Sequence, residues 1–502
     1  MSIIAATPIR FFLVIIPVIY VLTINSVSAS DLYQADQYFQ QAEYAQAKEQ
    51  YLLAANVGSA HAFYQLGVIH YKGLGEPANS VKALVWFSLA AEQQFNDAQQ
   101  IVDDLMALAT PAQQTELQQL QNQFRQQYGF QSINNALFPI INTSALGNKI
   151  TFGEENALAN QFSMSDMEFN DLSNIDFVEA PDMDDEASIQ YLLLGRPDAA
   201  DIRNRPYSAV VDYEVGADGS VRNMETMRVM GRIQPALNEL VRSNVPSPQF
   251  AAEKVSFVNR AYLGVAGYNQ VRIRRDQYQR FYYRLMRNAL KLKKSQIKNE
   301  QFQYATLLMT FQWLPQEENE LDDLLKTLSE AGHPLAQYEY GLKLYREQKD
   351  IPQAIRWLNE ASKFGVAKAQ YRLGRLMLDS PWVLKDETKA LFWFERAAAE
   401  QHDVAQLKAA ELKLMAVEPA LHNLQEAQQL LATLPESQHR NPEYEYLQAA
   451  VDVQVQPRKL AEAVEHLRDA IDLADNLNWD VSEWQKLLEK WTSGGKVTVS
   501  DL

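Results

Sequence analysis

The feature that most constrains this chain is a helix-turn-helix pattern that repeats along it. Residues 60–94 form one complete unit, in which two apolar helical segments flank a glycine-rich turn. Small residues recur 36 positions apart, as Ala47 and Ala83 do near the N-terminus and Ala354 and Ala390 do further on. A period of about 20 to 50 residues is typical of solenoids, whose units must stack because one helix pair cannot bury its own apolar face.

Glycines, alanines and tryptophans occupy equivalent places in these units. Small residues allow helices to approach closely, and the aromatic side chains keep the spacing of a packed core. The turn glycines break the first helix of a unit. We therefore predict structural roles for a set of repeat residues: Gly67, Gly73, Gly75, Ala83, Trp86, Ala90, Gly374, Ala390, Trp393 and Ala397.

The units resemble Sel1-like repeats, which are close relatives of tetratricopeptide repeats. The resemblance rests on these short motifs: Leu66-Gly67, Gly73-Leu74-Gly75, Trp86-Phe87, Leu373-Gly374 and Trp393-Phe394. Proteins of that family mostly serve as scaffolds for protein interaction. The resemblance therefore implies that this chain binds proteins or peptides through the grooves of its repeats.

The middle of the chain carries a different pattern. Residues 208–215 alternate apolar and polar side chains, and a glycine-containing turn at 216–219 leads into a second strand. A helix at 233–244 and strands at 254–263 and 268–275 are expected to follow. The order predicts a small α+β domain between two α-solenoid arrays, in a fold that is otherwise mainly α.

Residues 205–275 resemble the C-terminal domain of TonB-type energy transducers. The resemblance is carried by these elements: Arg205-Pro206-Tyr207, the strand at 208–215, the turn Ala217-Asp218-Gly219 and the segment 246–250. In that family the domain contacts outer-membrane receptors by pairing a sheet edge with a receptor peptide. The resemblance thus implies an alternative function, as an accessory of TonB-type energy transduction. The domain is internal here, so its fold can be kept without the transducing role.

The N-terminus predicts export. An apolar run at 11–22 is followed by Val27-Ser28-Ala29, which has the small residues that a signal peptidase needs. Cleavage between Ala29 and Ser30 would release a periplasmic protein with no membrane span. The alternative is an uncleaved anchor in the inner membrane. The run is short for a span of about 20 residues and contains Pro17, which favours cleavage.

Charge is distributed unevenly along the chain. The formal net charge of −17 disfavours nucleic acid as a main partner. Residues 150–195 hold eleven acidic residues and no Lys or Arg. This segment lacks the ligand spacing of a calcium-binding loop, so we interpret it as a solvated acidic linker.

A basic run interleaved with aromatic residues extends over 272–298. It could bind anionic lipid headgroups or another acidic partner, or it could neutralise the chain's own acidic linker. It could also be the exposed face of a connecting helix whose aromatic residues are buried, which is the most common case. The candidate partner-binding residues in this region are Tyr268, Arg272, Arg274 and Arg275.

The sequence carries no motif for catalysis. The absence of cysteine excludes disulfides, thiolate metal sites and thiol nucleophiles. The seven histidines form no HxH or HExxH spacing, and there is no GxSxG elbow, phosphate loop or dinucleotide fingerprint. We therefore predict no enzymatic activity, no cofactor and no metal site.

These patterns divide the chain into six predicted segments: a signal peptide (1–29), N-terminal helical repeats (30–140), an acidic linker (141–195), the α+β domain with its basic C-terminal helix (196–298), Sel1-like repeats (299–420), and repeat-like helices with a cap (421–502). The predicted function is that of an exported protein-interaction scaffold of the bacterial cell envelope. The sequence leaves the partner and the oligomeric state open.

Overall fold

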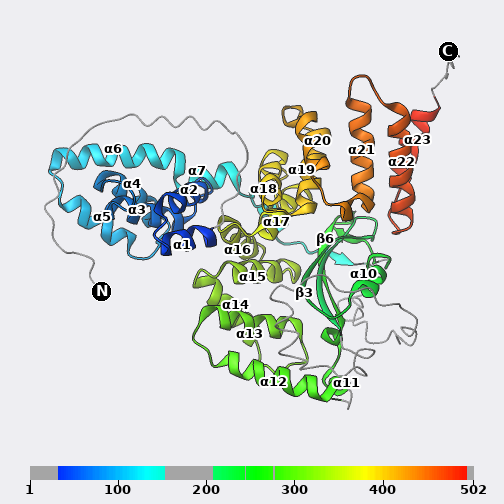
Figure 1. The fold of residues 1–502 in the computed structure, drawn as a ribbon, viewed down its shortest axis with the longest axis horizontal. Coiled ribbons are helices and arrows are strands. Elements are labelled where there is room, and N and C mark those ends of the chain that lie inside the picture. Colours follow the sequence, from blue (N-terminus) through cyan, green and yellow to red (C-terminus); the bar gives the residue numbers. More distant parts are fainter. Residues whose placement is uncertain (1–31, 153–206, 244, 275–277, 494–502) are drawn as a thin grey trace.

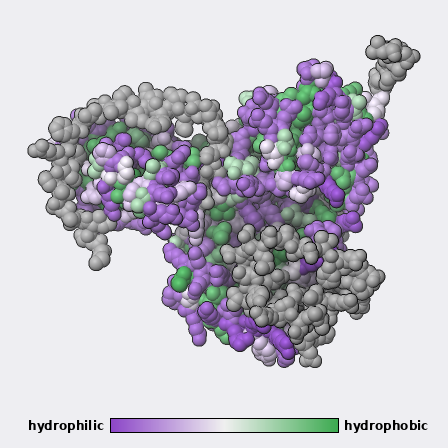
Figure 2. Space-filling model, viewed as in Figure 1, coloured by the Kyte–Doolittle hydropathy of each residue, from purple (hydrophilic) through white to green (hydrophobic). Residues whose placement is uncertain are grey.

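The computed structural model describes residues 32–152, 207–243, 245–274 and 278–493. Two arrays of antiparallel helix pairs flank a small region of strands, as the sequence predicts (Figure 1). The predicted signal peptide and most of the predicted acidic linker lie outside the described residues. The surface of the helices is largely hydrophilic, and apolar side chains are gathered between them (Figure 2).

The N-terminal array contains seven helices: α1 Leu32–Gln40, α2 Tyr44–Ala55, α3 Ala60–Lys72, α4 Ser80–Glu92, α5 Ala98–Ala107, α6 Pro111–Tyr128 and α7 Phe130–Leu137. Local signals set their ends. Gly73 ends α3 in the left-handed conformation (φ 67°), which glycine adopts without strain. The Asn79 side chain then caps α4 by accepting a hydrogen bond from the backbone N–H of Lys82.

The C-terminal array follows the strands and is longer: α12 Gln279–Lys293, α13 Lys298–Thr310, α14 Glu320–Glu330, α15 Pro334–Arg346, α16 Ile351–Lys363, α17 Ala367–Asp379, α18 Glu387–Ala399, α19 Asp403–Met415, α20 Leu424–Ala432, α21 Pro442–Gln454, α22 Leu460–Asp475 and α23 Ser482–Thr492. It curves around the strands, from α12 at one end to α22 and α23 at the other (Figure 1). One hydrophobic core runs through both arrays, from Leu32 to Ala416.

Two of the predicted glycines, Gly67 and Gly374, lie where helices cross. Gly374 of α17 faces α18, and a Cβ added there would overlap the buried ring of Phe394. Replacing Gly374 with alanine should therefore lower the free energy of unfolding by about 1–3 kcal/mol, measured by urea denaturation. Gly147→Ala is the matched control, because a Cβ at Gly147 meets no atom within 4 Å. Equal losses in the two variants would contradict close packing at Gly374.

The strands form a three-stranded antiparallel sheet of order β3-β2-β6, built from β2 Ser208–Val215, β3 Val221–Met230 and β6 Phe257–Gly264. The alternating apolar residues of β2 pack against α10 (Gln234–Val241), as the period-two pattern predicts. Beside this sheet lie three short strands, β1 Thr151–Phe152, β4 Pro248–Phe250 and β5 Glu253–Lys254.

Two strand predictions need correction. The strand expected at 254–263 begins only at Phe257, and the strand expected at 268–275 is wrong. After β6 the chain turns at Gly264 (φ 61°), where Tyr207 packs too closely for a side chain, and it passes into α11 (Gln270–Ile273). Ile273 is buried against α12 and α13. The apolar residues after Gly264 thus belong to the core of the helical array. Their alternation alone could not distinguish this short helix from a strand.

Candidate functional site: the inner face of the C-terminal repeats

Charged residues line the face of the C-terminal array that meets the sheet. The first helices of three successive units, α15, α17 and α19, carry Glu339, Arg372 and Lys408 at equivalent positions. All three side chains are buried. Burying a charge is costly unless it is paired and hydrogen-bonded, so each of them requires a partner. For Glu339 and Arg372 that partner comes from the sheet.

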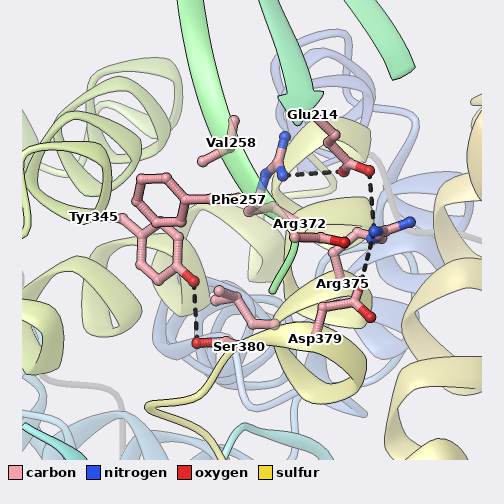
Figure 3. Close-up of a pocket in the computed structure, with 10 residues that line it drawn as sticks. Glu214, Phe257, Val258, Tyr345, Arg372, Arg375, Asp379 and Ser380 are labelled. Carbon is pink, nitrogen blue, oxygen red and sulfur yellow. Dashed lines mark hydrogen bonds and ion pairs between the residues drawn. The ribbon is translucent and has the colours of Figure 1, made fainter. Parts of the chain in front are cut away.

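Glu214 of β2 is the partner of α17 (Figure 3). Its carboxylate accepts hydrogen bonds from the Tyr371 hydroxyl at 2.8 Å, Arg372 Nη1 at 3.2 Å and Asn223 Nδ2 at 2.9 Å. Arg375 Nη2 lies 3.1 Å from Oε2, the oxygen that also accepts from Asn223. Burial by itself would raise the pKa of Glu214, but the guanidinium groups of Arg375 and Arg372 hold that pKa at about 2. The carboxylate is therefore ionised in the folded protein.

Asp212, two residues earlier on the same face of β2, forms a second buried pair. Arg260 of β6 donates to both of its oxygens, at 2.6 and 2.8 Å, and also reaches Glu339 of α15 at 3.0 Å. Burial tends to raise the pKa of Asp212, but Arg260 keeps it below its usual range. The pKa of Glu339 is raised, because burial outweighs its share of Arg260. The sheet is thus bound to α15 as well as to α17.

Further contacts extend this interface at both ends of the sheet. His402, at the start of α19, stacks on Tyr371 and lies 2.6 Å from Glu225 of β3. At the other end the chain after α22 reaches the hairpin turn, where the backbone N–H of Asp480 donates to Asp218 at 2.9 Å. The array therefore contacts the sheet along its inner face. The paired residues are as far as 262 positions apart in the sequence.

A second segment of the chain is bound by side chains of the same array. Residues 137–150 leave α7 and run along α17, α18 and the loop between them. Trp393 and Lys389 donate to the carbonyls of Leu137 and Phe138, at 2.7 and 3.2 Å. Trp382 Nε1 then donates to the carbonyl of Asn148 at 3.1 Å. Residues 141–152, which the sequence assigns to the acidic linker, are therefore packed on the repeats.

This bridging segment (137–150) is held through its backbone and through its apolar side chains, since Phe138, Ala145 and Ile150 are buried in the core of the arrays. Gln348 bonds to both the N–H and the carbonyl of Ile150, at 2.7 and 2.9 Å. The buried ring of Phe138 lies 5.2 Å from that of Trp393. Main-chain bonds combined with buried anchoring side chains are a general way for a protein surface to bind a peptide segment.

The part of the interface around Glu214 offers little room for a substrate. The pocket beside Glu214 and Arg375 has a volume of about 20 Å³, enough for a water molecule (Figure 3). A larger cavity of about 470 Å³ lies between β6 and α13–α15, and its lining mixes Arg346 and Lys343 with Glu347 and Asp322. Within the described ranges, no group of three or more His, Asp and Glu residues is placed to hold a metal ion. The buried charges are paired with one another, which suits a binding interface.

The residues predicted for partner binding lie elsewhere. Arg274 is exposed and its Nη2 donates to the Tyr282 hydroxyl at 3.0 Å, while Tyr268 packs edge-on against Tyr278. The side chain of Arg272 and all of Arg275 lie outside the described residues. Sequence reasoning missed the interface residues, because their partners are far away in the chain. The one signal available was the recurrence of charge at Glu339, Arg372 and Lys408 within otherwise apolar helix faces.

Comparison with known proteins identifies the repeats. A family model described as Sel1 repeat matches residues 60–95, 334–363 and 367–402. The chain contains Sel1 repeats. The matched segments hold the structural glycines, alanines and tryptophans that the sequence predicts for these units, and Ala83, Ala90, Ala390 and Ala397 are completely buried. Proteins with Sel1 repeats generally serve as interaction scaffolds, so the repeats imply protein partners.

Solved structures with helical repeats are similar to this chain. A Sel1 repeat protein from Oxalobacter formigenes is 19% identical over 45% of this chain and 63% of its own, with a TM-score of 0.31. The protein c5321, a protective antigen of uropathogenic Escherichia coli with an SLR fold, is 16% identical over 94% and 87%, with a TM-score of 0.30. Yeast Tom70 is 11% identical over 92% and 95%, with a TM-score of 0.24. No curated protein matches the sequence.

In the described part of the chain, no helix is both long and apolar enough to cross a membrane.

Proposed function

We propose that this Sel1 repeat protein is an exported, non-enzymatic interaction scaffold of the bacterial cell envelope, and that it binds protein partners through the inner face of its N-terminal repeats. Export rests on the sequence of the first 29 residues. The choice of surface rests on one comparison between the two arrays.

That comparison concerns the exposure of equivalent positions in α3 and α15. In α15 the residues Tyr338, Leu342 and Tyr345 are at most 4% exposed, because the array and the sheet cover them. Their counterparts in α3 are Tyr64, Val68 and Tyr71, and all of these are partly exposed. The C-terminal groove is thus occupied by the chain itself, while the N-terminal face keeps aromatic and aliphatic side chains accessible. Aromatic residues are enriched at protein interfaces.

The bridging segment supports the proposal by showing a binding mode that such repeats can provide. Trp393 and Lys389 of the C-terminal array bind the carbonyls of Leu137, at the end of α7, and of Phe138 just after it. Sel1 repeats of this chain can therefore bind polypeptide without a deep pocket, through main-chain bonds and buried apolar side chains.

A site-specific crosslinking experiment tests the choice of surface. A photoreactive residue at position 71 should crosslink to an envelope protein, and Val68→Glu in the same chain should abolish the product. Val417→Glu is the matched control, because Val417 is 81% exposed and lies in the C-terminal array. A product that survives Val68→Glu, in a variant with an unchanged melting temperature, would place the partner elsewhere. The intact mass of the periplasmic protein tests export, since cleavage would leave Ser30 as the first residue.

A second candidate function is that of an accessory in TonB-type energy transduction. The observation that favours it is the position of β3 at the edge of the sheet, where most of its residues are partly exposed. An added receptor strand would pair with such an edge. The same experiment separates the two candidates, because a photoreactive residue in β3 would then crosslink to an outer-membrane receptor while position 71 would give no product.

A further inference from the structure

We infer that one face of α12 is a docking surface for an anionic lipid bilayer. This basic face consists of Arg280, Arg287, Lys291 and Lys294. The helix lies at the outer rim of the molecule, and its basic face contains none of the α3 residues on which the proposed function rests (Figure 1). The inference is therefore independent of that function.

Helix geometry places the four cations together. Residues that are three, four or seven positions apart share one side of an α-helix, so the four side chains form a single stripe. The opposite side is buried, with Phe281 and Leu285 in the core that α12 forms with α13. The helix is thus fixed in rotation, and its basic face points into solvent.

These cations are also unpaired. They differ in this from Lys293 on the flank of the same helix, which lies 2.6 Å from Glu320. Within the described residues, none of the four side chains of the basic face takes part in a hydrogen bond or an ion pair. Four like charges in a row repel one another. An approaching anionic surface therefore lowers the electrostatic energy of the stripe.

Exposed apolar side chains lie along the same stripe, and they favour a lipid surface over an acidic protein. Tyr283 and Leu290 lie seven residues apart on α12 and are 57% and 51% exposed. Ile297, in the connection before α13, is 61% exposed. They are three of the twelve large apolar side chains that the described residues expose, so they are concentrated here. Cations interleaved with Tyr and Leu on one side of a helix, with an exposed Ile just beyond its end, match the bilayer interface, where phosphates meet acyl chains. A solvated acidic peptide would need only the cations.

The overall charge of −17 does not oppose such docking at physiological salt. The Debye length is then about 8 Å, so a bilayer held at α12 senses mainly the charges on that rim. Basic residues close to an anionic membrane contribute about fivefold each to partitioning, at roughly 1 kcal/mol per cation. Docking would set the orientation of the scaffold relative to the bilayer.

Vesicle sedimentation of residues 30–502 tests the inference. Vesicles of phosphatidylcholine and phosphatidylglycerol in equal parts should bind the protein, and vesicles of phosphatidylcholine alone should not. The triple variant Arg287→Gln, Lys291→Gln, Lys294→Gln should partition about 100-fold less. The matched control is Lys72→Gln, Arg458→Gln, Lys459→Gln, which removes the same charges from other exposed positions and should bind normally.

A third variant examines the apolar contribution. Tyr283→Ser with Leu290→Ser should weaken binding to the anionic vesicles while leaving the dependence on salt unchanged. Equal binding by the two triple variants, or no preference for phosphatidylglycerol, would overturn the inference. Binding to poly-glutamate without binding to vesicles would also overturn it, in favour of an acidic protein partner. All the substituted side chains are exposed, so circular dichroism should show an unchanged fold.

Discussion

Replacing Glu214 with glutamine is expected to lower the free energy of unfolding by about 3–5 kcal/mol. The substitution keeps the shape of the side chain and removes its charge. Arg375 retains its pair with Asp379, but Arg372 has no other carboxylate partner in the described parts of the chain. The loss therefore comes from an uncompensated cation in a buried interface, which is the most costly way to break a buried pair.

Urea denaturation followed by tryptophan fluorescence measures this loss, as a shift of the midpoint at constant m-value. Glu253→Gln is the control, because Glu253 is exposed on β5 and should change the stability by no more than about 0.5 kcal/mol. A loss below about 1 kcal/mol for Glu214→Gln would mean that water or a rearranged arginine compensates the charge, and that Glu214 does not fasten the sheet to the array.

The same carboxylate predicts how stability depends on pH. The pKa of Glu214 is about 2 in the folded protein and 4.5 when unperturbed, so the unfolded chain takes up a proton first as the pH falls. Its stabilising effect is complete above about pH 4.5 and is lost as the pH falls towards 2, for a total of about 3 kcal/mol. Stability curves over this range should therefore converge for the wild type and Glu214→Gln.

The second large effect is expected at Trp382. Its side chain is completely buried between α17 and α18 and contacts the rings of Phe250, Tyr345 and Phe257. Its indole N–H also holds Asn148 of the bridging segment. Trp382→Ala should cost about 3–5 kcal/mol, because it leaves a cavity where β4, β6, α15 and the bridging segment meet.

Limited proteolysis gives Trp382→Ala a local measurement in addition to denaturation. Loss of the indole should open the bridging segment, so cleavage within 137–150 should become faster than cleavage elsewhere. Trp382→Phe is the control, because it keeps most of the ring contacts and loses the hydrogen bond to Asn148, at a cost of about 1–2 kcal/mol. If Trp382→Ala unfolds at the wild-type midpoint and is cut at the wild-type rate, the segment is held by its other contacts.

The repeats could be read from the sequence because their determinants are local. The positions of Gly67, Ala83 and Trp86 are fixed by helical spacing and by the need for helices to approach closely, and both are visible within about 36 residues. The apolar face of β2 was also predictable, since alternation places Ala209, Val211 and Tyr213 on one side. The sequence thus determined the solenoid class and the presence of a small sheet between the arrays.

The other face of β2 was decided only by the tertiary structure. Asp212 and Glu214 have the alternating polar pattern of a solvent-exposed face, and yet both are completely enclosed by arginines from β6 and α17. Glu214 and Arg372 are 158 positions apart, and the local sequence around either residue does not predict that the other is its partner. An ionised carboxylate is buried at low cost only where a cation pairs with it. That pairing depends on how the array curves around the sheet.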